Sequence, residues 1–510
     1  MGELGAGLAA PIVGDGCDVD PLALSAEKMR EIGYRTIDLV VERLTGCDMP
    51  AMQRGCSQEL GERIGARIPH NQAEWPGLLR ELDETVLAFT SRLAHPGYFA
   101  FVPASSTFPG ALGDLIASAL DIDAGSWTSA SGASQLELVV LDWFKEWIGY
   151  PTGSAGVLVS GGSAANLTAL ACARETLVGA GSEQAVVYAS DHTHSSVARA
   201  ARLLGFDRAR CRSLPTDGRY RLPLDTLVEA LECDSRAGLQ PLIVVANAGA
   251  TNTGAIDPLP ELAALCRERG LWLHVDAAYG GFAALTGRGR RLLAGIELAD
   301  SITLDPHKWL YQPIECGCVL VREPGLLERA FAIAPDYLGD YRSHEVDFCD
   351  RGLQLTRSAR ALKIWLSVSY FGAEAFTEAI DRSLDLAQLA ERLILEHPSL
   401  ELLCPATLGV VCFRRRFAGL QDEQELARAN SELVSRFEAT GRGLVSSTRL
   451  DGRYAIRMCV MNHTTARADV ERTVSWLANV PEGIVAGAVR RDRPVPATRP
   501  VGLAPAIAAS

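Results

Sequence analysis

Short runs of β-branched and apolar residues alternate with helical patterns from about residue 110 to about residue 375, and this alternation restricts the possible fold more than any other feature. Two of the runs, Leu271–Val275 and Ser301–Leu304, begin about 30 residues apart, which is the length of one strand–helix–strand crossover. Strands separated by helices in this way form a mainly parallel sheet covered by helices. We therefore expect an α/β domain whose other strands include Val157–Val159, Ala185–Tyr188 and Leu242–Val245.

The flanks of this region carry different patterns. Residues 25–45 have an amphipathic helical pattern, and beyond Gly372 long helical patterns such as 421–440 alternate with strand-like runs. The first residues are rich in Gly, Ala and Asp, and the last are rich in Arg, Pro and Ala. The expected organisation is a disordered start at 1–20, a helical segment at 21–110, a large domain at 111–375, a small α+β domain at 376–484 and a disordered tail at 485–510.

Composition and charge exclude several classes of protein. The formal net charge is −13, which argues against a nucleic-acid partner because such proteins normally present a basic face. No apolar run is long enough to cross a membrane, and the N-terminus lacks the pattern of a secretory signal. The 13 cysteines are scattered, and Cys316 and Cys318 lack a second pair at the spacing of a zinc site. These observations predict a cytoplasmic protein with thiol cysteines and no metal centre.

Lysine is rare in this chain, and its few positions are therefore informative. Lys and Arg together number 49, yet the lysines are limited to Lys28, Lys145, Lys308 and Lys363. Arginine serves wherever a positive charge is enough, whereas a reaction that needs an amine able to lose its proton requires lysine. Lys308 follows a predicted strand and stands between His307 and Trp309. Burial there should lower the pKa of the Lys308 amine and favour a Schiff base with an aldehyde.

A second candidate segment, Ser160–Asn166, joins a predicted strand to a predicted helix. In open α/β sheets ligands bind beyond the carboxyl ends of the strands. Its glycines allow close approach of a ligand, and the N-terminus of the following helix offers free N–H groups and a positive dipole end. Gly162 and Ser163 are therefore candidates for holding a phosphate. A capped turn without a ligand would show the same pattern.

A third candidate is Asp276, which ends an almost wholly apolar strand. A carboxylate there needs a partner, which in a purely structural role would be a helix N-terminus or a cation. The functional interpretation is that Asp276 faces the pyridine nitrogen of pyridoxal 5'-phosphate (PLP), while small Ala278 lets the ring lie flat. His194 would stack on the other ring face; the alternatives are an ordinary loop histidine or a metal pair with His192. With Lys308, these strand ends predict a PLP site.

The chain also resembles the group II PLP-dependent decarboxylases from about residue 25 to about residue 480. The motifs that carry the resemblance are His-Val-Asp-Ala-Ala-Tyr at 274–279, Asp-Pro-His-Lys-Trp at 305–309, Asp-x-x-His-Ser-Ser at 191–196 and Leu-Asp-Trp at 141–143. This family includes the aromatic-L-amino-acid, glutamate, histidine and L-2,4-diaminobutyrate decarboxylases. The resemblance implies PLP fold type I with a seven-stranded, mainly parallel sheet, and a homodimer with active sites at the subunit interface.

The resemblance also implies roles for individual residues. Lys308 would bind PLP as a Schiff base, Asp276 would pair with the pyridine nitrogen and His194 would stack on the ring. The other cofactor contacts would come from Gly162, Ser163, Thr251, Ala278 and His307. The wall of the substrate pocket would include Phe101, Pro103, Ala104, Gly125 and His194.

Three positions depart from the family pattern. Asp305 stands where the aromatic enzymes usually have asparagine near the phosphate, and because an anion beside a phosphate is unfavourable, no phosphate contact is assigned to it. Phe348 aligns with the tyrosine that protonates the carbanion, with Tyr341 as the alternative catalytic residue. Gly125 replaces a bulky aromatic residue, so the pocket would accept a larger side chain, or a basic one if Asp123 points inward.

These observations predict a PLP-dependent carboxy-lyase that converts an L-amino acid, with aromatic substrates favoured, to the amine and CO2. Phenylalanine at the position of Phe348 accompanies aldehyde synthases among plant relatives, so decarboxylation coupled to oxidative deamination is an alternative. The run Leu310–Pro313 resembles the diaminobutyrate enzymes and keeps aliphatic or diamino acids open as substrates. A non-catalytic relative is a further alternative, which the intact Lys308, Asp276 and His194 oppose.

Overall fold

The computed structural model describes residues 20–46, 49–65, 68–102, 105–177, 183–333, 345–482 and 504–505. Within these ranges the chain forms two compact units. One unit contains the described residues up to Met49 together with Arg54–Thr90, and the other contains Pro50–Gln53 and the described residues from Ser91 onward.

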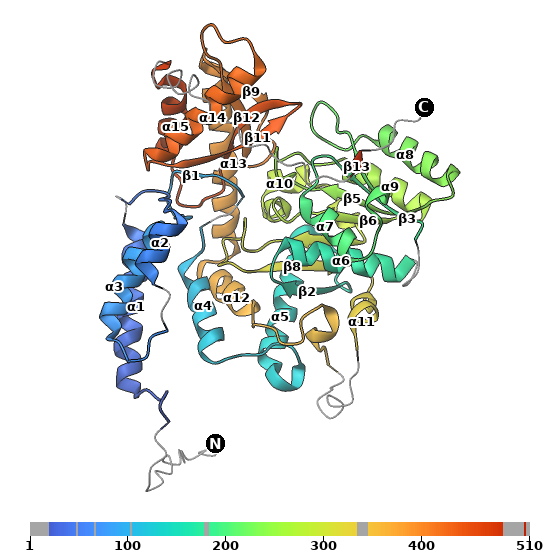
Figure 1. The fold of residues 1–510 in the computed structure, drawn as a ribbon. Coiled ribbons are helices and arrows are strands. Elements are labelled where there is room, and N and C mark those ends of the chain that lie inside the picture. Colours follow the sequence, from blue (N-terminus) through green and yellow to red (C-terminus); the bar gives the residue numbers. More distant parts are fainter. Residues whose placement is uncertain are drawn as a thin grey trace. The chain divides into compact units, whose positions relative to one another are not determined.

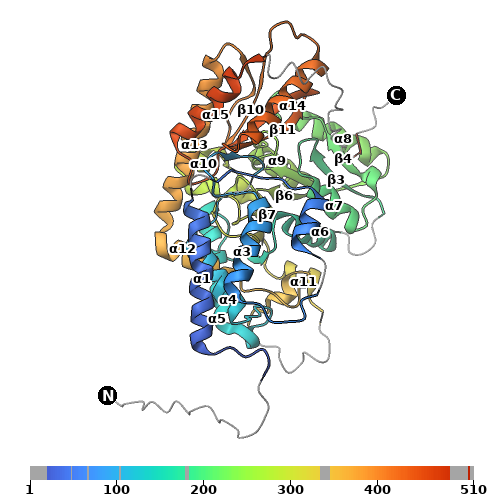
Figure 2. The ribbon, with the colours of Figure 1, turned by 60° about the vertical axis from the view of Figure 1, so that its left-hand side comes forward.

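The first unit is helical and consists of α1 (Ala26–Thr45), α2 (Ser57–Ile64), α3 (Trp75–Thr85) and the 3-10 turn Leu87–Phe89. Ser25 caps α1 by accepting a hydrogen bond from the backbone N–H of Lys28, and the helix predicted over 25–45 is confirmed. Helices α1 and α3 lie side by side in both views (Figure 1 and Figure 2). No residue of α1, α2 or α3 is buried, so apolar side chains such as Met29 and Leu44 remain open to solvent.

The second unit is built on a sheet in the order β13-β4-β3-β5-β6-β7-β8-β2, and several of these strands are labelled in Figure 1. Its seven longer strands are β2 (Ala155–Val159), β3 (Ala185–Ser190), β4 (Cys211–Leu214), β5 (Gln240–Asn247), β6 (Trp272–Asp276), β7 (Ser301–Leu304) and β8 (Gly317–Val321). Strands β3 to β7 pair in parallel, whereas β8 is antiparallel to both β7 and β2. The predicted α/β fold with a mainly parallel seven-stranded sheet is confirmed, and every strand expected from the sequence is present.

Two of these strands and one short pairing are absent from the sequence-based expectation. Strand β4 is short and carries Arg212 and Ser213 at its centre, which gives it little apolar signal. Strand β8 is apolar, buried and five residues long, as β2 and β6 are, so its pattern could have been recognised in the sequence. The two-residue strand β13 (Ala504–Pro505) pairs with β4, inside the tail expected to be disordered. Backbone pairing of two residues requires no apolar pattern, so sequence periodicity does not reveal it.

Helices cover this sheet and close a large core. Helix α6 (Gly162–Leu177) packs on β5, β6, β7 and β8, and α8 (Leu224–Arg236) and α9 (Leu259–Arg269) pack on β5. The remaining helices of this region are α4 (Phe108–Ala119), α5 (Trp127–Ile148), α7 (Ser195–Leu203), α10 (Gly287–Leu292), α11 (Leu326–Phe331) and α12 (Ala361–Phe371). Strands β2, β3, β6, β7 and β8 consist entirely of buried residues, as a sheet covered on both faces requires. In the described chain no helix has both the length and the apolar character needed to cross a bilayer.

A smaller sheet has the strand order β1-β11-β12-β10-β9. Its elements are β1 (Tyr98–Phe99), β9 (Leu400–Cys404), β10 (Val410–Arg415), β11 (Leu444–Leu450) and β12 (Arg453–Cys459), with helices α13 (Ala373–Glu396), α14 (Glu423–Ala439) and α15 (Arg467–Asn479). Strand β1 comes from the aromatic stretch near residue 100 and pairs in parallel with β11. A separate apolar core forms here, around residues such as Val411, Leu433 and Ile456.

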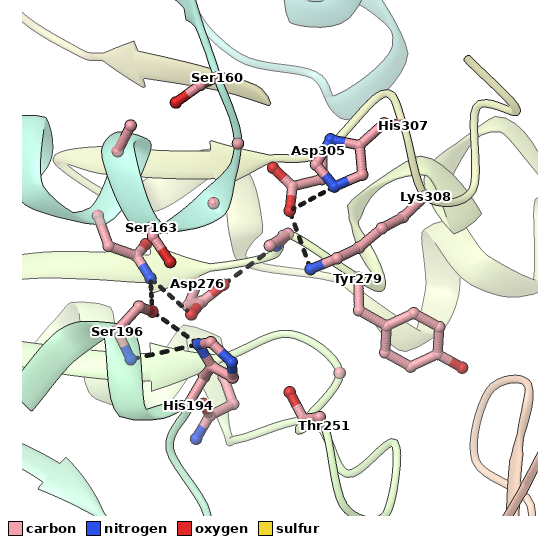
Figure 3. Close-up of a pocket in the computed structure, with 17 residues that line it drawn as sticks. Ser160, Ser163, His194, Ser196, Thr251, Asp276, Tyr279, Asp305, His307 and Lys308 are labelled. Atoms are coloured by element: carbon pink, nitrogen blue, oxygen red, sulfur yellow. Dashed lines mark hydrogen bonds and ion pairs between the residues drawn. The ribbon is translucent and has the colours of Figure 1, made fainter. Parts of the chain in front are cut away.

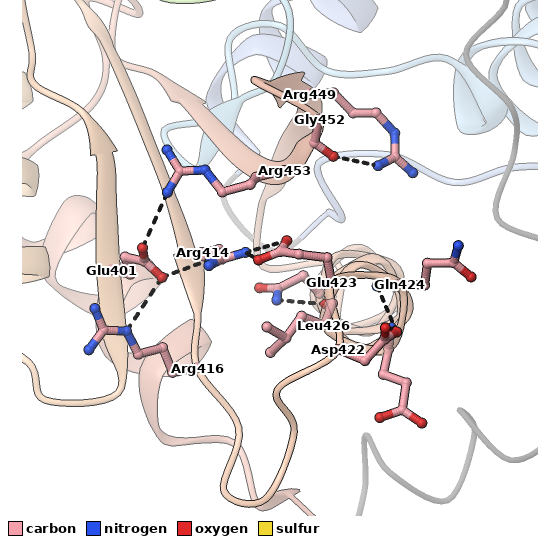
Figure 4. Close-up of polar contacts among 12 residues, drawn as sticks. Glu401, Arg414, Arg416, Asp422, Glu423, Gln424, Leu426, Arg449, Gly452 and Arg453 are labelled. Carbon is pink, nitrogen blue, oxygen red and sulfur yellow. Dashed lines mark hydrogen bonds and ion pairs between the residues drawn. The ribbon is translucent and has the colours of Figure 1, made fainter. Parts of the chain in front are cut away.

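Arg414 on β10 links this strand to β9 and to α14 through ion pairs (Figure 4). Its Nε donates to Glu401 on β9 at 2.8 Å, and its Nη1 donates to Glu423, the first residue of α14, at 2.7 Å. Arg416 and Arg453 also contact the Glu401 carboxylate. The network therefore holds β9 and the start of α14 against β10 outside the apolar core.

Candidate active site

A pocket of about 300 Å3 lies at the carboxyl ends of strands β2, β3, β5, β6 and β7 (Figure 3). Ligands bind in this position in open α/β sheets, since neighbouring parallel strands end at the same edge. The pocket is lined by eight residues predicted from the sequence: Gly162, Ser163, His194, Thr251, Asp276, Ala278, His307 and Lys308. Residues that are far apart in the sequence are thus brought to one site.

Lys308 forms an ion pair inside this pocket. Its Nζ lies 2.9 Å from Oδ2 of Asp305, the first residue after β7, which is 1% exposed. His307 Nε2 lies 3.8 Å from the same oxygen, and His307 Nδ1 donates to the carbonyl oxygen of Cys316 at 2.5 Å. Figure 3 shows Lys308 and His307 converging on Asp305. The residue that departs from the family pattern is therefore the direct partner of the lysine amine.

The pKa of Lys308 differs from the sequence-based expectation, which was wrong in direction. Burial, the largest single influence, lowers the pKa of the Lys308 amine, but the charge and hydrogen bond of Asp305 and the charge of Asp276 together raise it by more. The pKa therefore lies above its ordinary value. The fold places two carboxylates beside the amine, and their effect is not visible from burial alone. Lys308 is protonated at neutral pH and must lose a proton before it can attack an aldehyde.

Asp276 ends strand β6 and lines the same pocket, with 8% of its surface exposed. Its Oδ2 accepts a hydrogen bond from Asn166 Nδ2 at 2.9 Å, and its Oδ1 accepts from the backbone N–H of Ala278 at 3.2 Å. Both donors are neutral. The carboxylate therefore keeps its charge available for a further partner in the pocket.

His194 precedes helix α7 and also lines the pocket. Its Nδ1 accepts from the backbone N–H of Ser196 at 3.3 Å and lies 2.7 Å from Ser196 Oγ. Burial lowers the pKa of the His194 imidazole, although the charge of Asp276 opposes this, so the ring is neutral at pH 7. His192 packs against Tyr220 instead, with ring centroids 5.0 Å apart. In the described ranges no group of three or more His, Cys, Asp or Glu side chains is arranged for a metal ion.

The junction between β2 and α6 forms one wall of the pocket. Because α6 begins at Gly162, the backbone N–H groups of its first turn have no partner within the helix. A β-carbon at Gly162 would lie 2.8 Å from Asp305 Oδ2 and 3.1 Å from Ala278 Cβ, so any side chain here would collide with the pocket wall. Free N–H groups beside a glycine at the start of a helix favour an anion such as phosphate.

The donor set of this pocket fits PLP. The first turn of α6 and the Ser163 hydroxyl suit a phosphate, the Asp276 carboxylate suits a protonated pyridine nitrogen, and the Lys308 amine suits an aldehyde. Thr251 also lines the pocket, and its carbonyl oxygen accepts from Arg457 Nε at 2.8 Å. The glycine at position 162 keeps clear the space that such a cofactor needs.

Of the residues predicted for the substrate wall, His194 lines this pocket, whereas Phe101 and Gly125 do not. Phe101 is 61% exposed and does not line it. Gly125 is buried elsewhere, where a β-carbon would lie 2.4 Å from the carbonyl oxygen of Leu355. The backbone at Leu355 therefore requires glycine here. Pro103 and Ala104 lie outside the described residues.

The positions considered for a proton donor and a basic-substrate contact also differ from expectation. Phe348 is fully buried under the guanidinium groups of Arg351 and Arg357, which lie 5.5 and 5.0 Å from its ring centroid. It does not line the pocket of this chain. Asp123 Oδ1 accepts from the backbone N–H of Arg357 at 2.9 Å and serves the local backbone. Tyr341 lies outside the described residues.

Sequence reasoning missed the buried amides behind the pocket. Asn166 contacts Asp276, and Asn247 Nδ2 donates to Thr193 Oγ1 at 3.1 Å and to Asp257 Oδ2 at 3.1 Å. Both amides line the pocket. A signal was available, because Asn166 interrupts a run of small and apolar residues in α6 and Asn247 ends an apolar strand.

A family model and curated proteins match most of this chain. The model of the pyridoxal-dependent decarboxylase conserved domain matches residues 58–416. The chain is 38% identical over 453 residues to the aromatic-L-amino-acid decarboxylase of Bacillus atrophaeus, covering 88% of this chain and 94% of that protein. It is 30% identical over 454 residues to the phenylacetaldehyde synthase of Arabidopsis thaliana, covering 86% of this chain and 92% of that protein.

A solved structure is similar over almost the whole chain. The crystal structure of Oryza sativa TDC with PLP and tryptamine matches with a TM-score of 0.86 at 29% identity. The match covers 92% of this chain and 100% of that chain. The fold described above is therefore shared with that protein.

Proposed function

Because the chain belongs to the pyridoxal-dependent decarboxylase family, we propose that it removes CO2 from an aromatic L-amino acid and releases the corresponding amine. The observation that carries this proposal is the presence of the Lys308 amine and the Asp276 carboxylate in one pocket, at the first turn of α6. An amine for the aldehyde, an acid for the pyridine nitrogen and N–H groups for the phosphate are what PLP requires of a protein.

Each of these groups has a separate task. Lys308 would hold the cofactor through its amine, Gly162 and Ser163 would hold the phosphate, and the neutral His194 ring would cover the cofactor ring. When bound, PLP supplies an electron sink for the electron pair that the departing CO2 leaves behind. Asp276 sustains this sink, because a carboxylate that receives only neutral donors favours a protonated ring nitrogen.

Asp305 would accept a proton from the Lys308 amine and return it. Its Oδ2 lies 2.9 Å from Nζ, within the distance of direct proton transfer. The lysine amine must give up a proton to bind the cofactor and regain one when a substrate amine takes its place. Asp305 is 1% exposed, and its carboxylate is the direct partner of the amine.

Relatives support an aromatic substrate. The decarboxylase of Bacillus atrophaeus that is 38% identical to this chain acts, by its name, on aromatic L-amino acids. The solved Oryza sativa protein holds tryptamine, an aromatic amine. We therefore propose tryptophan, tyrosine, phenylalanine or a close analogue as the substrate.

A second candidate function is decarboxylation coupled to oxidation, which yields an aldehyde. It is favoured by the 30% identity to a phenylacetaldehyde synthase and no longer by Phe348, whose ring is buried away from the pocket. This reaction consumes O2 and water and releases ammonia and hydrogen peroxide together with the aldehyde and CO2. The two functions therefore differ in products that can be measured side by side.

The decisive experiment incubates the purified protein and PLP with L-tryptophan, L-tyrosine, L-phenylalanine, L-glutamate, L-histidine and L-2,4-diaminobutyrate. CO2, amine and hydrogen peroxide are recorded for each. We expect CO2 and amine in equal amounts from at least one aromatic amino acid, and none from Lys308→Ala. Hydrogen peroxide equal to CO2 would favour the second candidate. The absence of CO2 from every aromatic amino acid, or full activity of Lys308→Ala, would contradict the proposal.

We also propose that the protein is a homodimer. The support is the apolar surface that a single chain leaves open: Met29, Val41 and Leu44 in the first unit, and Leu115, Leu120 and Tyr370 in the second. Exposed apolar side chains of this kind can be covered by a second copy of the chain. Light scattering after size exclusion should give twice the mass of one chain; the mass of a single chain at working concentration would contradict this.

We propose a cytoplasmic location for the enzyme. In the described part of the chain all eleven cysteines are free thiols, as is usual where cytosolic reductants act. Activity recovered in the soluble cytosolic fraction of the source cells would agree with this, and activity outside the cell would contradict it.

A further inference from the structure

One buried amide connects Asp276 to His194. Asn166 on helix α6 is 1% exposed. Its Nδ2 donates one hydrogen to Asp276 Oδ2 at 2.9 Å and the other to Ser196 Oγ at 2.9 Å, and Ser196 in turn meets His194 (Figure 3). Both hydrogens of the amide are thus committed to side chains that line the pocket.

The orientation of this amide is fixed from both sides. A carboxylate only accepts, so the atom of Asn166 that faces Asp276 must be the nitrogen. The amide oxygen then faces inward, where it accepts from Thr303 Oγ1 at 2.7 Å and lies 3.0 Å from His274 Nε2. Since an oxygen cannot donate, the hydrogen in the second contact belongs to His274 Nε2.

Beyond His274, the hydrogen bonds keep the same donor-to-acceptor direction. Burial lowers the pKa of His274 to about 4, so its ring is neutral and its other nitrogen, Nδ1, is an acceptor. Ser301 Oγ lies 2.9 Å from this nitrogen and itself accepts from Trp272 Nε1 at 2.8 Å. The indole can only donate. All of these hydrogen bonds therefore point in one direction. They begin at the Trp272 indole, which only donates, and end at the Asp276 carboxylate, which only accepts.

The branch toward His194 is equally defined. Ser196 Oγ accepts from Asn166 and turns its own hydrogen to His194 Nδ1, 2.7 Å away. The backbone N–H of Ser196 donates to the same nitrogen at 3.3 Å. With two donors on Nδ1, the neutral ring must carry its hydrogen on Nε2.

We propose that Asn166 is a positioning residue for the reaction, which holds Asp276 as a carboxylate that only accepts and, through Ser196, keeps the hydrogen of His194 on Nε2. This inference rests on the proposed function of the pocket. Asn166 acts through Asp276 and His194. Asp276 sets the charge opposite the pyridine nitrogen, and His194 presents its Nε2–H as a donor to the ring or the substrate. Helix α6 thus contributes a buried control of protonation as well as its phosphate-binding first turn.

The substitution Asn166→Asp tests this with little change of shape. It removes both hydrogens and sets two carboxylates against each other across the present 2.9 Å contact, so that they must share a proton. A proton taken by Asp276 prevents it from accepting the pyridine N–H. At lower pH the introduced carboxyl is itself protonated and can donate again, so the defect should shrink as the pH falls.

The first measurement is the dissociation constant for PLP of protein stripped of cofactor, between pH 6 and pH 8.5. For Asn166→Asp we expect binding about 10- to 100-fold weaker at pH 8, the size of one lost hydrogen bond to a charged group, with recovery toward pH 6. The matched control is Thr168→Val, because Thr168 is equally buried on α6 but its hydroxyl donates only to the carbonyl oxygen of Ala164. We expect less than about a twofold change in the control. Wild-type affinity and pH dependence in Asn166→Asp would overturn the inference.

The second measurement needs no variant at Asn166, so it decides the matter even if Asn166→Asp does not fold. Solid-state 15N NMR of the histidine-labelled holoenzyme, with His194 assigned by difference from His194→Gln, reports which ring nitrogen carries hydrogen. We expect hydrogen on Nε2 alone. Hydrogen on Nδ1, or on both nitrogens, would overturn the inference.

Failure of this inference can be told apart from failure of the proposed function. If the wild-type protein releases no CO2 from any amino acid, the function fails, while cofactor affinity and the histidine spectrum still decide the role of Asn166. If CO2 is released and Asn166→Asp binds PLP like the wild type, only the role of Asn166 fails.

Discussion

Asp305 sets the charge of the Lys308 amine, and it does so against the effect of burial. The carboxylate oxygen lies 2.9 Å from Nζ and is itself almost inaccessible to solvent. In this position a carboxylate both stabilises the ammonium form and offers the nearest site for its proton. The charge of Asp305 therefore sets the pH range in which the Lys308 amine loses its proton.

The substitution Asp305→Asn should lower the pKa of Lys308. With the opposing charge removed, burial becomes the dominant influence on the amine, and burial lowers its pKa. Only the neutral amine attacks an aldehyde, so the pH at which PLP adds at half its maximal rate should fall. The measurement is the rate at which the absorbance near ~420 nm appears on mixing cofactor-depleted protein with PLP. Asp142→Asn is the control, because Asp142 pairs with Lys145 outside the pocket; an unchanged or higher midpoint in Asp305→Asn would refute the argument.

The substitution Asp276→Asn should separate cofactor binding from catalysis. Lys308 and the first turn of α6 still hold PLP, but an amide cannot stabilise a protonated pyridine nitrogen as a carboxylate does. We expect cofactor to remain bound while kcat falls by roughly 100-fold or more. Spectroscopic titration and steady-state kinetics measure the two effects, and an unchanged kcat would mean that the ring nitrogen needs no anionic partner.

At the scale of elements, the junction between β2 and α6 depends on a glycine. The first turn of α6 must meet the end of β7 closely, since a β-carbon at Gly162 would lie 2.8 Å from Asp305 Oδ2. The space that would hold the cofactor is therefore created by the absence of a side chain. A strand–glycine–helix pattern in the sequence predicts this junction, but only the packing of β7 beside it explains why glycine is needed.

The substitution Gly162→Ala should weaken cofactor binding without unfolding the protein. The new methyl group must push Asp305 or Ala278 aside, and crowding of this kind costs a few kcal/mol, or about 10- to 100-fold in affinity for PLP. The control is Gly153→Ala, where a β-carbon would meet nothing within 4 Å. Equal affinities of the two variants would show that the first turn of α6 does not hold the cofactor.

For the molecule as a whole, two buried groups make stability depend on pH in opposite directions. Burial raises the pKa of Asp257 to about 6 from 3.8 and lowers that of His274 to about 4 from 6.5. Between these values folded Asp257 keeps a proton that the unfolded chain has released, so its contribution to stability falls as pH rises. Folded His274 lacks a proton that the unfolded chain holds, so its contribution rises with pH. The two contributions partly offset each other from pH 4 to pH 6.

The substitution Asp257→Asn should therefore expose the contribution of His274. We expect the urea midpoint of the variant to rise more steeply between pH 4 and pH 6 than that of the wild type, whatever the overall loss of stability. The comparison uses the slope with pH, because the amide also replaces an acceptor of three hydrogen bonds. Equal slopes in the two proteins would contradict the assigned pKa of Asp257.

The sequence by itself determined five of the seven longer strands of the sheet and the principal groups of the site. Apolar periodicity marks where strands end, and parallel strands end at one edge, so Asp276, Lys308 and the Gly162–Ser163 junction had to meet there. The scarcity of lysine drew attention to Lys308, although Lys28, Lys145 and Lys363 form ordinary ion pairs. These inferences need only the order of elements along the chain.

Only the tertiary structure decided which side chains touch. It placed Asp305 on Lys308, which raised a pKa that the sequence indicated would fall, and it buried Phe348 under two arginines away from the pocket. It also placed Asn166 within hydrogen-bond distance of Asp276 and Ser196, a contact that no sequence motif predicts. Such contacts depend on the packing of residues distant in sequence to within fractions of an ångström, and periodicity fixes the face of an element but not those distances.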